Sequence, residues 1–171
     1  MITIRPEHPR DVAGVRYVNE RAFGQPLEAN LVEKLRERCH EALSLVADEG
    51  DRVVGHIMFT PVVVEDGTRR TVGMGLAPMA VVPERQRQGI GSQLVRRGLE
   101  ILRERECPFV IVVGHPEYYP RFGFESAAKH GLRCQWAGVP DEAFMALILD
   151  ATATAGLSGL VTYRPEFSDD Q

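Results

Sequence analysis

Hydrophobic and polar residues change their spacing along the chain, and the first part of this pattern predicts one strand and two helices. Residues 2–5 alternate and predict a short strand. Residues 9–23 and 27–38 carry apolar side chains at helical spacing, and Gly24-Gln25-Pro26 between them breaks a helix. We therefore expect two consecutive helices after the first strand.

Three apolar stretches follow the helices and predict paired strands. Residues 43–47 form a short run, residues 70–82 form a long one, and residues 53–64 form a long one that Pro61 is expected to interrupt. Glycine-containing turn sequences at residues 48–51 and 65–67 separate the three stretches. Successive strands joined by tight turns predict an antiparallel meander.

The second half of the chain begins with a polar loop and continues with a helix and a buried strand. Residues 84–91 are polar and contain glycine, whereas residues 92–105 place apolar side chains on one helical face and arginines on the other. Residues 109–113 are continuously apolar, as in a central strand. After an irregular, aromatic-rich segment, residues 144–149 and 160–163 predict a terminal strand pair.

This order of elements predicts an α+β fold with a mixed, mostly antiparallel sheet flanked by helices. The 171 residues include 44% hydrophobic and 26% charged side chains, which is an ordinary globular composition. The length suits one compact domain, and the sequence contains no linker or repeat that divides it. We therefore expect a single domain over residues 1–171.

Charge and cysteine content narrow the classes of function. The net charge of −4 disfavours a general nucleic-acid binder, which normally carries a basic face. Apolar runs stay well below the roughly 20 residues of a membrane helix, and the N-terminus lacks the pattern of a signal peptide. Cys39, Cys107 and Cys134 form no CxxC pair, so we expect reduced thiols in a cytoplasmic protein without a metal site.

The loop at residues 86–91 carries the clearest chemical signal. A glycine-bearing loop between a strand and a helix binds anions, because the first amides of the helix have no intrahelical partner and lie at the positive end of its dipole. Gly89 and Gly91 let a phosphate approach the backbone, and Arg85 and Arg87 add positive charge nearby. We therefore expect a diphosphate group as the ligand of this loop.

Known phosphate-binding patterns limit which diphosphate this is. The Walker sequence is absent, and Leu94 stands where the dinucleotide fingerprint requires its third glycine. The remaining pattern, Q-x-x-G-x-G, places Gln86, Gly89 and Gly91 at its fixed positions. Here the chain resembles the GNAT superfamily of N-acyltransferases, whose hallmark is [QR]-x-x-G-x-[GA] at a strand-loop-helix junction.

Further segments extend the resemblance over almost the whole chain. The strand at residues 79–83 looks like the family's strand before the loop, and residues 119–124 look like its Y-x-x-x-G-F segment. Residues 163–167 resemble a bacterial subgroup, which indicates a bacterial-type single-domain member. One departure is the compact sequence of residues 114–117, where many members have an asparagine and a longer helix.

The resemblance implies acetyl-CoA as co-substrate, without a metal. Amides from Gln88 to Ser92 are expected to bind the pyrophosphate, strand residues 79–81 to pair with the pantetheine arm, and the Val81 N–H to stabilise the oxyanion. The cofactor-binding residues implied in this way are Met79, Ala80, Val81, Gln86, Arg87, Gln88, Gly89, Ile90, Gly91 and Ser92.

The resemblance also implies transfer of an acetyl or other acyl group to an amine by direct attack on the thioester. Tyr119 aligns with the family's acid, which protonates the leaving thiolate, and the adjacent Tyr118 is the alternative. The amine must lose a proton first, and the candidate general bases are Glu28, Glu33, His115, Glu117 or water.

Several alternatives stay open at this point. A non-catalytic acyl-CoA-binding domain, or less favourably an unrelated nucleotide binder, would carry the same loop. The acceptor is expected to be a small-molecule or peptide amine. Its pocket is expected to be shaped by the helix pair and by residues 24–26 and 127–140. The acyl-chain preference and the oligomeric state, with a homodimer as one option, are undetermined by the sequence.

Overall fold

The computed structural model describes residues 1–168 and contains two compact units that share strands. Unit 1 consists of Met1–Thr60, Ala77–Glu100 and the segment from Pro165, and unit 2 consists of Pro61–Leu76 and Ile101–Arg164. The prediction of one domain over residues 1–171 stays a prediction.

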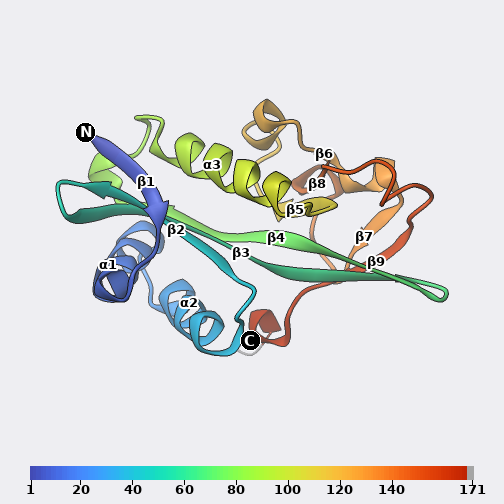
Figure 1. The fold of residues 1–171 in the computed structure, drawn as a ribbon, viewed down its shortest axis with the longest axis horizontal. Coiled ribbons are helices and arrows are strands. Elements are labelled where there is room, and N and C mark those ends of the chain that lie inside the picture. Colours follow the sequence, from blue (N-terminus) through green and yellow to red (C-terminus); the bar gives the residue numbers. More distant parts are fainter. Residues whose placement is uncertain (169–171) are drawn as a thin grey trace. The chain divides into compact units, whose positions relative to one another are not determined.

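The elements follow the predicted order closely (Figure 1). The α-helices are α1 (Val12–Phe23), α2 (Leu27–Arg38) and α3 (Ile90–Glu104), and the strands are β1 (Ile2–Pro6), β2 (Leu43–Glu49), β3 (Arg52–Asp66), β4 (Arg69–Val81), β5 (Phe109–Val113), β6 (Glu125–Ser126), β7 (Leu132–Cys134), β8 (Phe144–Ile148) and β9 (Gly159–Thr162). Short 3-10 turns are η1 (Pro9–Asp11), η2 (Pro83–Arg85), η3 (Tyr119–Phe122), η4 (Ala127–His130), η5 (Asp141–Ala143) and η6 (Pro165–Ser168).

Unit 1 is a sheet with the order β1-β2-β3-β4 and helices on both faces. A Cβ added at Gly55 of β3 would lie 3.1 Å from Leu94 of α3, so α3 packs closely on that face. The side chain of His56, the next residue, contacts α1 instead, because successive strand residues face opposite sides. Figure 1 accordingly shows α1 and α2 on one side of these strands and α3 on the other.

A β-bulge changes which side of β3 faces α1. Ala47 pairs with Gly55 but Asp48 pairs with Val53, so Val54 is an extra residue in the ladder. Val53 therefore points to the same side as His56, where a Cβ added at Gly14 of α1 would lie 3.1 Å from its side chain. The bulge and the glycine together let the start of α1 lie close to the sheet.

A chain of buried polar contacts links α1, α2 and the sheet of unit 1. The Asn19 amide donates to His56 Nδ1 (3.2 Å), and His56 Nε2 lies 2.9 Å from Ser44 Oγ. Ser44 donates to Glu7 (2.5 Å), which also accepts from Arg36 (2.6 Å). Burial, and to a lesser degree the charge of Arg36, lowers the pKa of His56 to about 3, so this imidazole is neutral.

Unit 2 contains both parallel and antiparallel pairs. β4 and β5 are parallel, with Gly75 opposite Ile111, and β5 pairs antiparallel with β8. β8 also pairs with β6, and β9 pairs antiparallel with β3 and parallel with β7. The predicted α+β fold with a mixed, mostly antiparallel sheet is therefore confirmed.

Two details of the predicted strands are wrong. β3 runs through Pro61 without interruption, because pairing with β2 ends at Phe59 and pairing with β9 begins at Val63, so the missing proline N–H removes no bond on that edge. The last two long strands, β8 and β9, do not pair with each other. Their actual partners include β6 and β7, which are too short for a sequence pattern to reveal.

The contact between α3 and β3 predicts an unusual response to a helix-favouring substitution. A Cβ at Gly98 would lie 2.3 Å from Phe59 Cε1, and Phe59 is fully buried. Gly98→Ala should lower the free energy of unfolding by about 1–2 kcal/mol through overpacking, despite the better helix propensity of alanine. Urea denaturation measures the difference, with exposed Arg97→Ala as a control expected to stay within about 0.5 kcal/mol. Stabilisation by Gly98→Ala would show that Phe59 has room to move.

The neutral state of His56 predicts a pH dependence of stability. The pKa of His56 is about 3 in the folded protein and 6.5 in its ordinary state. Between pH 3 and pH 6.5, therefore, the imidazole binds a proton only in the unfolded chain. The free energy of unfolding should therefore fall below pH 6.5, by up to about 1.4 kcal/mol per pH unit from this group.

His56→Gln should remove that contribution and flatten the profile between pH 6.5 and 4, whereas His115→Gln, at an exposed position, should not. Chemical denaturation at several pH values measures both slopes. Equal slopes for wild type and His56→Gln would contradict the prediction.

Candidate functional site

The predicted pyrophosphate loop is an exposed connection between β4 and α3, within unit 1. The helix begins at Ile90, two residues earlier than predicted, and the preceding residues 86–89 are all exposed. Gly89 accepts the first helical hydrogen bond, from the Gln93 N–H (3.1 Å). The amides of Ile90, Gly91 and Ser92 therefore belong to the first turn, where helix geometry supplies no intrahelical acceptor and the dipole favours an anion.

The backbone of this loop adopts left-handed conformations at two positions. Arg87 has φ 65°, which is uncommon for a residue other than glycine, and Gly89 has φ 84°. A Cβ at Gly89 would meet nothing within 4 Å. The glycine is thus required by the backbone conformation, and the space beside it is open to a ligand.

Two glutamines hold the loop in place through their side-chain amides. Gln86 donates to the main-chain carbonyl of Val81 at the end of β4 (2.9 Å). Gln88 donates to the carbonyl of Glu84 in η2 (3.3 Å). Both bonds connect the exposed part of the loop to the residues that precede it, so the predicted ligand-binding glutamines also have a structural role.

Ion pairs fix η2, and they change the predicted roles of the arginines. Arg85 donates to Glu49 (2.9 Å), so its charge is compensated. Arg87 has no recorded partner among residues 1–168, which leaves its guanidinium available to a phosphate. Arg21 and Arg52 both contact Glu84, at 3.0 and 3.4 Å.

Local donors favour the charged form of Glu84. A hydrogen bond from its own backbone N–H, followed by the charge of Arg21, lowers the pKa of its carboxyl below the usual range. Sequence reasoning missed this group, because no spacing rule connects Arg21, Arg52 and Glu84.

The end of β4 presents main-chain groups at a strand edge of unit 1. The Val82 N–H donates to the Val54 carbonyl of β3 (3.0 Å). Because successive residues of a strand direct their main-chain groups to opposite edges, Val81 and Met79 face away from β3, and Ala80 faces toward it. Of the three predicted pantetheine contacts, Met79 and Val81 are therefore the two that can pair with a ligand at the free edge.

The predicted acid, Tyr119, begins η3 in unit 2. Its side chain is only 7% exposed, and its ring packs edge-to-face on Phe124 and Tyr118, with centroids 5.7 and 5.0 Å away. A Cβ on Gly114 would lie 2.4 Å from this ring, so the glycine provides the space for it. Burial, followed by the influence of Tyr118, raises the pKa of Tyr119, which keeps the phenol protonated at neutral pH.

The two adjacent tyrosines differ in their surroundings. Among residues 1–168 no hydrogen bond of the Tyr119 hydroxyl is recorded. Tyr118 is half-buried and lies beneath the guanidinium of Arg121, 4.4 Å from its ring centroid. Within residues 1–168 the Tyr119 hydroxyl therefore has no hydrogen-bond acceptor in the protein.

The four candidate bases lie in different surroundings. Glu33 of α2 forms an ion pair with Arg16 (2.9 Å), and Glu28 accepts from Gln25 (3.2 Å). His115 and Glu117 are exposed and follow β5 in unit 2, where the His115 carbonyl accepts from the Tyr119 N–H (3.3 Å). His115 and Glu117 are thus the two candidates in the same unit as Tyr119.

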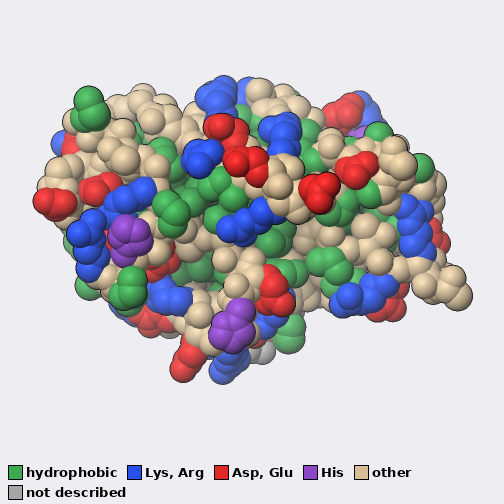
Figure 2. Space-filling model, viewed as in Figure 1, with side chains coloured by type: hydrophobic (Ala, Val, Ile, Leu, Met, Phe, Trp, Pro, Cys, Tyr) green, Lys and Arg blue, Asp and Glu red, His purple; other side chains and the backbone are tan. Residues whose placement is uncertain are grey.

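Other classes of site find little support in the described residues. Residues 1–168 contain no cluster of three or more His, Cys, Asp or Glu side chains able to hold a metal ion. The helices of this part of the chain are all too short or too polar to cross a membrane. On the face shown in Figure 2, basic and acidic side chains are interspersed.

Comparison with known proteins identifies the class. The family model described as acetyltransferase (GNAT) domain matches residues 3–127. The chain therefore belongs to the GNAT family of acetyl-CoA-dependent N-acetyltransferases.

Individual relatives are similar over nearly the full chain. The uncharacterized N-acetyltransferase YhbS of Escherichia coli K12 is 42% identical over 166 residues, which is 96% of this chain and 98% of that protein. The crystal structure of E. coli YhbS in complex with CoA has a TM-score of 0.91 at 39% identity, covering 99% of this chain and 93% of that one. A GNAT acetyltransferase from Brucella melitensis in complex with acetyl-CoA has a TM-score of 0.77 at 34% identity, covering 98% of each chain.

The open space at Gly89 gives a test of the loop with a matched control. Gly89→Glu places a carboxylate beside the helix amides and should abolish CoA binding, measured by calorimetric titration. Gly67→Glu makes the same change in the β3–β4 turn, where the glycine also has a positive φ (63°) and no neighbour within 4 Å. Both variants carry similar backbone strain, so only the first should lose CoA. Unchanged CoA affinity in Gly89→Glu would exclude the loop as the pyrophosphate site.

Proposed function

We propose that this protein transfers an acetyl group from acetyl-CoA to a small-molecule or peptide amine, by direct attack of the amine on the thioester. The observation that carries the proposal is the exposed start of α3 beside the edge of β4, both in unit 1. Crystal structures of the E. coli and Brucella relatives contain CoA and acetyl-CoA respectively, which supports the same donor here.

In this proposal the loop binds the pyrophosphate with main-chain groups. The amides from Gln88 to Ser92 donate to phosphate oxygens, and the helix dipole adds favourable potential. Arg87 supplies the uncompensated positive charge, since Arg85 is paired with Glu49. The left-handed conformation of Gly89 allows the phosphate to approach the backbone closely.

The edge of β4 binds the pantetheine arm and polarises the thioester. Met79 and Val81 direct their N–H and C=O groups to this edge, so an extended ligand can pair with them as another strand would. Gln86 already bonds the Val81 carbonyl (2.9 Å), which leaves the Val81 N–H as the donor for the thioester oxygen. That N–H stabilises the negative charge that develops on this oxygen during attack.

Tyr119 is proposed as the acid that protonates the departing thiolate of CoA. Its phenol holds its proton at neutral pH because burial raises the pKa, and its hydroxyl has no recorded hydrogen-bond acceptor among residues 1–168. The hydroxyl is not one of the buried polar atoms left without a partner, so it reaches the surface, where a ligand can meet it. Tyr118 is the alternative donor.

Before attack, the ammonium form of the acceptor must lose a proton. His115 and Glu117 are the proposed protein bases because they share unit 2 with Tyr119 and are exposed, and a water molecule is the alternative carrier. Glu33 is less suited, because its carboxylate is already paired with Arg16 (2.9 Å) and it lies in unit 1.

The proposed reaction is tested by following free thiol released from acetyl-CoA in the presence of a panel of amines, beside a binding titration of CoA. Thiol release that depends on one class of amine, with acetylated amine as product, is the expected result. Tight CoA binding without turnover on any amine would favour a non-catalytic acyl-CoA-binding protein instead.

Replacing the two tyrosines separately distinguishes their roles. Tyr119→Phe should lower turnover by about 10²-fold or more with little change in CoA affinity, because general acid catalysis is lost while the packed ring is kept. Tyr118→Phe should change turnover much less. Near-normal turnover of Tyr119→Phe at saturating acetyl-CoA, together with a large loss in Tyr118→Phe, would assign the role to Tyr118.

A further inference from the structure

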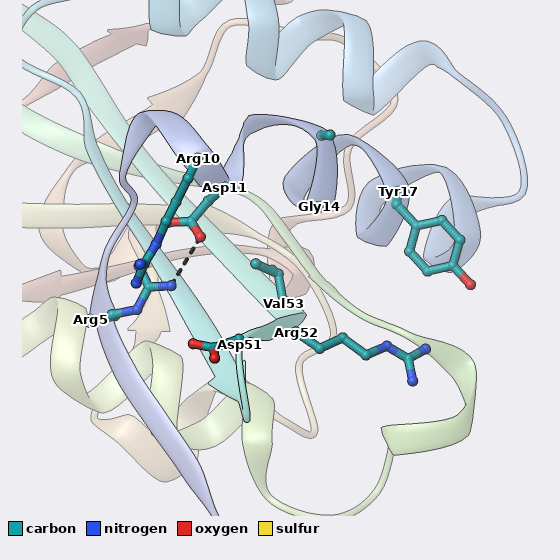
Figure 3. A pocket seen from close by; sticks show the side chains of 9 residues that line it. Arg5, Arg10, Asp11, Gly14, Tyr17, Asp51, Arg52 and Val53 are labelled. Carbon is teal, nitrogen blue, oxygen red and sulfur yellow. Dashed lines mark hydrogen bonds and ion pairs between the residues drawn. The ribbon is translucent and has the colours of Figure 1, made fainter.

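A second candidate site lies in unit 1, in a cavity of about 530 Å³ that the mechanism does not use. The cavity lies between the beginning of α1 and the turn that joins β2 to β3 (Figure 3). Its wall on α1 extends only to Tyr17, well before the Gly24 end of the helix, where the acceptor wall is expected. Its size suits a small metabolite.

Two of the charged groups in the cavity are already paired with each other. Arg5 donates two hydrogen bonds to Asp11 (2.7 and 3.0 Å) and a third to Asp48 (3.2 Å). The Arg5 guanidinium, as the largest influence, lowers the pKa of the Asp11 carboxyl to about 2. This group is therefore a fixed part of the cavity wall, visible as the dashed contact in Figure 3.

The remaining charged groups have unused hydrogen-bonding capacity. Neither Arg10 nor Asp51 has a recorded partner among residues 1–168, although both line the cavity. Arg52 has a single recorded contact, to Glu84 at 3.4 Å, for a guanidinium that offers five N–H donors. The cavity thus presents two guanidinium groups and one carboxylate to a ligand.

The backbone conformation of the β2–β3 turn holds Asp51 and Arg52 at the cavity. Asp51 adopts a left-handed conformation (φ 69°) in this turn, directly before β3 begins at Arg52. The bulge at Val54 then directs Val53 toward α1, beside Gly14. The apolar side chain of Val53 and the phenol of Tyr17 add uncharged surface to the same cavity.

We propose that this cavity binds a small zwitterion that carries both a carboxylate and an ammonium group, as a free amino acid or a dipeptide does. A guanidinium of Arg10 or Arg52 binds the carboxylate through paired N–H donors, and Asp51 accepts from the ammonium. Inorganic phosphate suits the cavity less well, because the Asp51 carboxylate repels a dianion and phosphate carries no ammonium group to pair with that carboxylate.

Occupancy of the cavity should also affect the CoA loop, because the two share Glu84. Arg52 lines the cavity and contacts Glu84 (3.4 Å), whose other ion-pair partner is Arg21 (3.0 Å). A zwitterion that draws Arg52 away leaves Glu84 held by Arg21 alone. The Kd of CoA should then rise by up to about fivefold, the limit set by one exposed ion pair.

The test is a calorimetric titration of the full chain with glycylglycine and L-alanine, beside propionate, propylamine and inorganic phosphate. Zwitterions should bind more tightly than either half-molecule or phosphate. Arg10→Gln and Asp51→Asn should each weaken zwitterion binding by about tenfold or more and leave CoA affinity in its absence unchanged. Asn keeps the left-handed conformation at position 51, so folding is preserved.

Arg103→Gln, at an exposed arginine of α3 without a recorded partner in the described chain, serves as the control and should bind the zwitterions like wild type. Zwitterion binding that persists in both Arg10→Gln and Asp51→Asn would place the ligand elsewhere. Phosphate binding of equal strength would contradict the proposed preference for a zwitterion. Unchanged CoA affinity at saturating zwitterion would overturn the coupling through Glu84. Failure of the acetyl-transfer assay alone leaves these binding outcomes unaffected.

Discussion

The hydrogen bond from the Val82 N–H to the Val54 carbonyl determines much of unit 1. It fixes the end of β4 against β3, so the alternation of the strand turns the main-chain groups of Val81 to the free edge. The Gln86 amide meets the Val81 carbonyl there and starts the loop. The position of the helix amides, and so the proposed anion site, depends on where β4 stops pairing.

Sequence patterns located the elements well where the signal is local. α2 and β5 begin and end at the predicted residues, because each is a contiguous stretch with one dominant period. Partners distant in the sequence were not predictable in the same way. The pairing of β8 and β9 with other strands is a property of the whole sheet, and β6 and β7, with 2 and 3 residues, contain too few positions to show a period.

The same distinction between local and distant residues applies to the candidate site. The loop is continuous in the sequence, and its glycines are explained by the close approach of a phosphate. Its residues could therefore be predicted from the sequence. The compensation of Arg85 by Glu49 and the shared contacts of Glu84 depend on side chains from separate elements, and no spacing encodes them. The buried bonds of His56 likewise join separate elements, since its partners are Asn19 of α1 and Ser44 of β2.

The bond from Gln86 to Val81 also gives a chemical meaning to the first position of the loop pattern. What that position supplies is an N–H donor for a strand carbonyl, and no acceptor is needed. Glutamine and arginine both provide such a donor at the end of a long side chain, which agrees with the pattern's tolerance of either. A glutamate of similar length offers only oxygen and would repel the carbonyl, so its presence at this place would mark a chain whose loop is held in some other way.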